Sequence, residues 1–431
     1  MPSQKKHHLL SAAAWKTHFV FWIGAILVGL ATVALTVGSE YLTQLFKSLH
    51  LEYLLYSFIF TPLCLTLLAW VTFRFFPGAE RSGVPQVKAA LQPAESIGSR
   101  PLLGLRIIIG KLILSMGGIL SGASVGLGGP SIHIGAALMV YIGRFANFTP
   151  HYLEKGLILA GSSAGFAAIF SAPLAGIVFA IEEMGRSLEE KTSGIIITAV
   201  IFAGATALVL LGQYAYFPNN HFIFPWGKAW LIIPICGVFT GLMGGLFSLI
   251  LLKGGALLKS VPSLSPLKIA FLCGIVIAIV NALTQGDTAG TGYQETKNYL
   301  LHAESMSAEY PFMRMLSTIA TFFVGIPAGI FVPSLSIGAG LGANLANLIP
   351  IAPLSVVILL GMSGYFAGML QSPLTSFVII MEMTNSHELL LPMMATAFIA
   401  SGTSKIICPQ SLYQGLSQAY LRVDNSEQKK S

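Results

Sequence analysis

The sequence predicts an all-α polytopic membrane protein built from two related halves, and three observations support this fold class. Of 431 residues, 54% are hydrophobic and only 10% are charged. No acidic or basic residue occurs between Arg314 and Glu382, a stretch long enough for several membrane spans of roughly 20 residues each. Two sequence blocks also recur in the same order about 200 residues apart, which indicates an internal duplication.

The chain begins with a short basic segment, residues 1–17, which precedes an apolar run from Phe19 to Val37. Small residues lie before that run and not after it, so a cleaved signal peptide is not predicted. The net charge of +7 is dispersed, and the lysines of both tails favour cytoplasmic termini over nucleic-acid-binding arms. The four cysteines stand singly without CxxC spacing, so we expect buried thiols and neither a metal site nor a cofactor.

The duplication is clearest when GSSAGFAAIFSAPLAGIVFAIEEM, from Gly161, is aligned with GMSGYFAGMLQSPLTSFVIIMEMT, from Gly361. Just upstream, PSIHIGAAL from Pro130 matches PSLSIGAGL from Pro333. The identical positions of the longer block are Gly161, Ser163, Phe166, Ala167, Pro173, Leu174, Val178 and Glu182, which recur as Gly361, Ser363, Phe366, Ala367, Pro373, Leu374, Val378 and Glu382.

In both copies, glycine and proline interrupt the apolar segments, and several segments are shorter than a membrane span. Non-helical backbone is tolerated at membrane depth only where it is buried in protein or lines a polar cavity. Corresponding broken helices in two halves therefore point to a binding site near the middle of the membrane. The alternative is that the glycines only allow helices to pack closely.

The interrupted segments favour an anion as the ligand. The stretches GLGGP, Gly126 to Pro130, and GIFVP, Gly329 to Pro333, each precede an apolar helix, and proline is common just inside a helix start. Two converging helix N-termini offer free N–H groups to an anion, and glycine lets it approach closely. No acidic residue is near in sequence to hold a cation. No lysine or arginine is near either, and amides alone would bind weakly enough for passage.

Six blocks resemble, in order, the signature segments of CLC chloride channels and chloride/proton antiporters, from about Phe19 to Leu421. They are RSGVPQVKAAL from Arg81, GLGGPSIHIG from Gly126, SAPLAGIVFAIEEM from Ser171, GIFVP from Gly329, SPLTSFVIIMEMT from Ser372 and SLY from Ser411. The resemblance implies the CLC fold of tilted, broken helices in two inverted-topology repeats, over residues 18–215 and 216–410. A C-terminal helix and short tail, residues 411–431, would follow, without the CBS domains of many eukaryotic members.

The resemblance also implies chloride as the ligand and a homodimer in the lipid bilayer with one pore per subunit. Its anion-binding positions fall here on the hydroxyls of Ser82 and Tyr413 and on amides of Leu127, Gly128, Gly129, Ile330, Phe331 and Val332. Taken alone, such a serine would be a turn residue and such a tyrosine an interface anchor. In the family, serine at position 82 accompanies chloride.

One departure from the family pattern decides the predicted mechanism. The usual motif G-[KR]-E-G-P reads Gly126-Leu127-Gly128-Gly129-Pro130 here, so glycine replaces the glutamate that gates antiporters and carries their protons. Glycine can neither compete with chloride nor titrate. We therefore expect an uncoupled chloride channel; the alternative is a chloride/proton exchanger whose gate has been relocated.

Three further residues have open interpretations. Glu183 matches a proton-transfer glutamate of many antiporters, and we expect a relic or structural role in preference to proton transfer. Arg81 either attracts chloride at the inner mouth or pairs with Glu80. For His133 we expect a packing role in preference to a substitute proton carrier.

An enzymatic function is not expected. Gly122 to Gly126 matches the G-x-S-x-G pattern around Ser124, but that motif works in a strand-to-helix turn and no strand pattern surrounds it. No nucleic-acid partner is expected. The short termini and the resemblance favour a multi-pass protein of a cell membrane, the bacterial inner membrane, with both termini in the cytoplasm.

Overall fold

The computed structural model describes residues 12–92, 102–144, 151–185, 190–212, 216–217, 224–261, 264–302 and 307–421. Within these ranges the chain is helical and contains no β-strand, which confirms the all-α class. Most of the predicted N-terminal segment, most of the C-terminal tail and their lysines at 5, 6, 429 and 430 lie outside the described residues.

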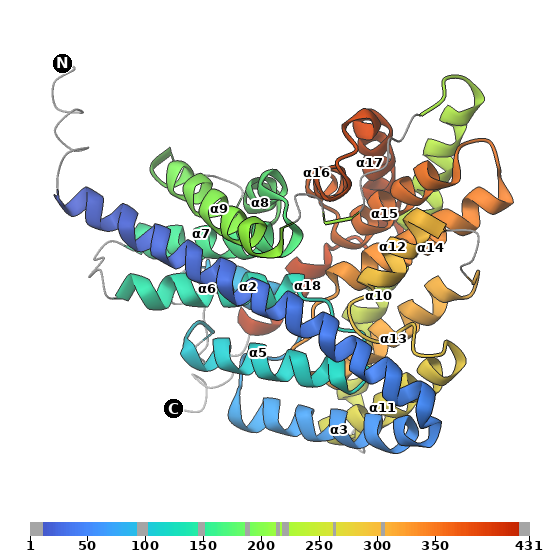
Figure 1. Ribbon diagram of the computed structural model, residues 1–431, viewed down its shortest axis with the longest axis horizontal. Coiled ribbons are helices and arrows are strands. Elements are labelled where there is room, and N and C mark those ends of the chain that lie inside the picture. The colour runs from blue at the N-terminus through green and yellow to red at the C-terminus, as the bar shows by residue number, and fades with distance from the viewer. Residues whose placement is uncertain are drawn as a thin grey trace.

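The helices fall into two successive groups (Figure 1). The first group consists of α2 (Ala12–Glu52), α3 (Leu54–Phe75), α4 (Val84–Ala90), α5 (Leu105–Leu120), α6 (Gly128–Gly143), α7 (His151–Phe170), α8 (Pro173–Phe179), the π-helical turn η3 (Ala180–Met184) and α9 (Glu190–Leu211). The second consists of η4 (Lys228–Leu231), α10 (Ile232–Ser260), α11 (Pro266–Leu283), α12 (Tyr293–His302), α13 (Tyr310–Val324), α14 (Phe331–Leu348), α15 (Leu354–Leu370), α16 (Pro373–Thr384), η6 (His387–Leu389), α17 (Leu390–Ile407) and α18 (Leu412–Leu421).

Six helical stretches in the described chain are long and apolar enough to cross a membrane. They are Phe19–Glu52, Ser57–Phe75, Gly194–Leu211, Lys228–Leu258, Pro266–Leu283 and His387–Ile407. Their outward faces carry exposed apolar side chains, as on α3, where Leu63 and Leu67 are each 57% exposed. Large exposed aliphatic side chains at helical spacing suit contact with lipid, in agreement with a polytopic membrane protein.

The same helix pairings recur in the two groups. In the first, α6 packs on α7, α7 packs on α9, and α2 contacts both α7 and α9. In the second, α14 packs on α15, α15 packs on α17, and α10 contacts both α15 and α17. The pairs α6–α7 and α14–α15 both touch through glycines. A methyl group on either Gly135 or Gly161 would meet the backbone carbonyl of its partner glycine, and the same holds for Gly338 and Gly361. Close helix packing therefore explains these four glycines.

Two glutamates connect the groups by completing each other's helices. At the start of α8, the amides of Leu174 and Ala175 donate to Glu382 at 3.0 and 2.8 Å. At the start of α16, the amides of Leu374 and Thr375 donate to Glu182 at 3.0 and 2.6 Å. The first amides of a helix lack intrahelical acceptors, and a carboxylate also suits the positive end of the helix dipole. Each half thus supplies the acidic cap that the other half needs.

Candidate functional site

The N-termini of α6 and α14 meet in the interior of the protein. The amide of Gly126 donates to the carbonyl of Gly329, and the amide of Gly329 donates to the carbonyl of Gly126, each at 2.8 Å. Each of these glycines lies two residues before the start of its helix. The two short connections are therefore held antiparallel, and both helices start from the same point of the fold.

Close approach explains why glycine stands at these two positions. A methyl group on Gly126 would lie 2.7 Å from Cδ of Pro333, and one on Gly329 would lie 2.9 Å from Cδ of Pro130. Ordinary carbon contacts are roughly 3.5–4.0 Å. The duplicated motifs thus contact each other reciprocally, the glycine of one against the proline of the other, as expected for two related halves that meet at a shared site.

Both helix starts lack the usual partners for their first amides. The residues at the N-cap positions, Leu127 and Ile330, have apolar side chains and provide no cap. No hydrogen bond joins the amides of residues 127–129 or 330–332 to an acceptor in the described chain. All six residues are buried. Buried N–H groups without acceptors are costly, so these two helix ends are suited to an anionic ligand.

The hydroxyls of Ser82 and Tyr413 reach the same region from outside the two motifs. Ser82 lies two residues before α4, and Tyr413 is the second residue of α18. A methyl group on Gly129 would overlap Oγ of Ser82, and the ring of Tyr413 lies 5.7 Å from that of Phe331. The two hydroxyls lie near each other. Neither makes a regular hydrogen bond to the described chain, although both residues are only 1% exposed.

The structure therefore brings all eight expected anion-binding residues to one place, from four separate parts of the sequence. Neutral donors surround that place: backbone amides from two helix starts and two free hydroxyls. Such donors bind an anion without a fixed countercharge, which favours weak and reversible binding.

Lys111 was not anticipated by the sequence analysis, which found no basic residue close in sequence to the two motifs. Lys111 of α5 is fully buried, and its Nζ donates to the carbonyl of Arg81 at 2.6 Å, directly before Ser82. The fold thus places one cation behind the Ser82 loop. The absence of basic residues therefore holds for the sequence around the two motifs and does not extend to the spatial surroundings of the Ser82 loop.

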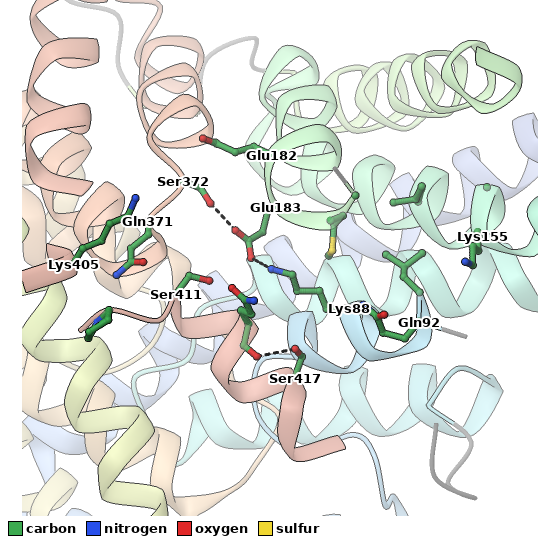
Figure 2. Close-up of a pocket in the computed structure, with 17 residues that line it drawn as sticks. Lys88, Gln92, Lys155, Glu182, Glu183, Gln371, Ser372, Lys405, Ser411 and Ser417 are labelled. Atoms are coloured by element: carbon green, nitrogen blue, oxygen red, sulfur yellow. Dashed lines mark hydrogen bonds and ion pairs between the residues drawn. The ribbon is translucent and has the colours of Figure 1, made fainter. Parts of the chain in front are cut away.

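Glu183 lines a cavity of about 720 Å³, to which Gln414 and Ser417 of α18 also contribute. Figure 2 shows its carboxylate between Lys88 and Ser372. Nζ of Lys88 lies 2.5 Å from one carboxylate oxygen, and the hydroxyl of Ser372 donates to the other at 2.6 Å. The π-helical turn η3, Ala180–Met184, carries both Glu182 and Glu183: Glu182 caps α16 and Glu183 pairs with Lys88. Glu183 therefore makes structural interactions through both oxygens.

The other residues with open interpretations are also accounted for. The guanidinium of Arg81 lies over the ring of Phe322 at 4.8 Å, and Glu80 accepts the amide of Gly78 at 2.7 Å. Of the two alternatives for Arg81, the pair with Glu80 therefore does not form, and attraction of chloride stays a prediction. His133 is buried against the Ser82 loop, with Nε2 2.7 Å from the carbonyl oxygen of Leu102, and this contact agrees with the expected packing role.

Ser124 has hydroxyl neighbours and no catalytic base. Its Oγ lies 2.8 Å from the hydroxyl of Thr318, and its amide donates to Thr321. The residue is 1% exposed and lies in a helical fold without strands in the described chain. Nucleophilic catalysis requires a base within hydrogen-bond reach, so the G-x-S-x-G match carries no hydrolase function.

The comparisons with known proteins agree with this geometry. Residues 64–405 match the family model described as voltage gated chloride channel. Among curated relatives, the chain is 27% identical over 397 residues to the H(+)/Cl(−) exchange transporter ClcA of Klebsiella pneumoniae subsp. pneumoniae, covering 86% of this chain and 80% of that protein. It is also 27% identical over 455 residues to ClcA of Salmonella arizonae, covering 96% and 91%.

Two solved structures share the fold. A slow cyanobacterial Cl−/H+ antiporter superposes with a TM-score of 0.84 at 23% identity, over 95% of this chain and 99% of that chain. A eukaryotic CLC transporter superposes with a TM-score of 0.77 at 19% identity, over 94% and 74%.

Proposed function

The chain belongs to the voltage gated chloride channel family, and we propose that within this family it is an uncoupled, passive chloride channel. The observation that carries the proposal is Gly128. Chloride is the anion in the names of its curated relatives. The ligand site would use the hydroxyls of Ser82 and Tyr413 together with the amides of residues 127–129 and 330–332.

Coupled exchange needs a side chain that binds a proton at one moment and competes with the anion at another. In the antiporters that this chain resembles, that side chain is a glutamate at the position of Gly128. A glycine has neither the proton-binding group nor the negative charge. We propose that this substitution distinguishes the protein from the antiporters whose motif it otherwise resembles.

The surroundings of Glu183 support the same conclusion. A carboxylate that relays protons must release them readily, but Glu183 is 5% exposed and is bound on both oxygens by Lys88 and Ser372. We therefore assign Glu183 a structural role at the inner mouth.

The second candidate function is a chloride/proton exchanger with a relocated gate. The acid that favours it is Glu40 of α2, which lies within the apolar helical stretch Phe19–Glu52. An acid within a membrane-spanning helix is a functional candidate by default. If exchange occurs, Glu40→Gln should abolish the proton flux.

The deciding experiment measures chloride and proton movement in the same reconstituted vesicles. A chloride gradient is imposed with equal pH on both sides, and external pH is followed. A passive channel moves chloride at a rate set by the chloride gradient and membrane potential, without pumping protons. Sustained uphill proton movement that stops when the chloride gradient is removed would refute the channel.

The assembly and placement follow from the same proposal. All anion-binding residues come from a single chain, so a homodimer in the cell membrane would contain one complete pore per subunit. We place the repeat boundaries at residues 18–215 and 216–410, with 411–431 as the terminal segment and both termini in the cytoplasm.

A further inference from the structure

The ring of Phe170 occupies the space next to Gly128. Phe170 is the last residue of α7, and its side chain is fully buried. A methyl group on Gly128 would lie 2.8 Å from Cζ of Phe170 and 3.0 Å from Cδ2 of Phe331. A larger residue at position 128 would therefore displace the Phe170 ring, and the absence of a side chain there is what allows the ring its present position.

Aromatic rings continue in both directions from this point. On one side, Phe331 contacts the ring of Tyr413 in α18, the helix whose residues Gln414 and Ser417 line the cavity at Glu183. On the other side, Phe170 meets Tyr216 edge to face at 6.0 Å, and Tyr216 meets Tyr293 edge to face at 4.9 Å. The rings therefore form one connected series of contacts from Tyr413 through Phe331 and Phe170 to Tyr216 and Tyr293.

The rings of Tyr216 and Tyr293 are fixed by contacts with separate elements. Phe217 stacks on Tyr293 at the start of α12, with centroids 5.5 Å apart. Its amide also donates to the carbonyl of Met383 in α16 at 2.9 Å. Tyr216 is therefore held between Phe170 and α12, and its ring packs against the ring of Phe170.

We propose that Phe170, backed by Tyr216, forms the outer constriction of the pore in place of the missing gating carboxylate. This inference rests on the proposed chloride pathway past Gly128. A chloride ion that leaves the amides of residues 127–129 meets aromatic carbon, which cannot replace its lost hydration. Apolar constrictions close pores by excluding water. The positive edges of the rings give a passing anion its least unfavourable route when the rings turn.

The test is the initial rate of chloride efflux from vesicles. A proton ionophore is present, so that proton movement does not limit the efflux. Phe170→Ala should raise the rate about tenfold, which corresponds to a barrier lower by about 1.4 kcal/mol. Phe170→Leu, a milder change for folding, should raise it severalfold, and Tyr216→Ala should raise it less than Phe170→Ala.

Phe247→Ala is the matched control, because Phe247 is equally buried and contacts Tyr365 away from this stack. Rates within twofold of wild type in folded, monodisperse Phe170→Ala and Phe170→Leu would overturn the proposal. An equal rise in Phe247→Ala would overturn it too, since general loosening would then explain the effect. Proton pumping by the wild type would refute the passive channel and leave this rate comparison valid.

Discussion

Replacing Gly128 by glutamate would reintroduce a carboxylate at the position where the exchangers carry their gate. The new Cβ would lie 2.8 Å from Phe170 and 3.0 Å from Phe331, so the two rings must retreat by about 0.7 and 0.5 Å to reach ordinary contact. The closest atom is the tip of the Phe170 ring, which a side-chain rotation can move. We therefore expect Gly128→Glu to fold with the carboxylate close to the free amides of the two helix starts.

The expected block follows from the strength of one hydrogen bond between that carboxylate and a free amide. Such a bond is worth about 1.5–3 kcal/mol, and chloride must displace it to enter the outer site. Because each 1.4 kcal/mol changes a rate about tenfold, efflux at neutral pH should fall roughly ten- to a hundredfold. Acidification protonates the carboxyl group, removes its charge and should restore efflux along a one-proton curve.

Chloride efflux from vesicles between neutral and acidic pH measures this effect. Gly128→Gln is the control, since it adds the same bulk without a titratable group, and its efflux should not change with pH. If Gly128→Glu conducts like wild type at neutral pH, or if Gly128→Gln is also relieved by acid, Gly128 does not lie at the outer anion site.

Three further predictions concern the contacts around the site. Glu382→Ala removes two charge-assisted hydrogen bonds from amides at the start of α8 and should lower the free energy of unfolding by about 3–6 kcal/mol, measured as a drop in thermal unfolding temperature. Glu182→Ala removes more exposed bonds and should lower it less, and the reverse order would contradict the mutual capping. Lys88→Met leaves the carboxylate of Glu183 buried without its cation and should lower the free energy of unfolding by about 3 kcal/mol. Adding Glu183→Gln should restore most of this stability, and a double variant as unstable as Lys88→Met would show that the ion pair is not the cause. Tyr413→Phe removes one neutral donor and should weaken chloride binding about two- to tenfold in calorimetry, whereas unchanged affinity would exclude the hydroxyl from the site.

The sequence predicted the fold class because composition and charge-free stretches report directly on a membrane environment. It also predicted that the two helix starts containing Gly126 and Gly329 converge, because corresponding broken helices of two repeats meet at a shared binding site. The contacts of Lys111 and Lys88 were not predicted. Their partners lie 30 and 95 residues away, and a lysine in an amphipathic or apolar helix carries no local sign of what it will meet.

Phe170 and the two glutamates show where the limit lies. The alignment identified Glu182 and Glu382 as equivalent positions, yet it could not tell that each would cap the other's neighbouring helix. Phe170 stands one residue before SAPLAG and reads as ordinary apolar sequence. Its position against Gly128 depends on how α7 packs against the helix starts, which is a property of the tertiary structure.

The exchange of caps between Glu182 and Glu382 also determines when each helix can acquire its cap during synthesis. Glu382 follows Leu174 by 208 residues, so α8 leaves the ribosome long before its acceptor exists. At about 5–20 residues per second, the first half waits roughly 10–40 s with bare amides at membrane depth. We therefore expect that ribosomal stalling or truncation between the halves yields a species that lacks the caps of α8 and that quality-control proteases recognise.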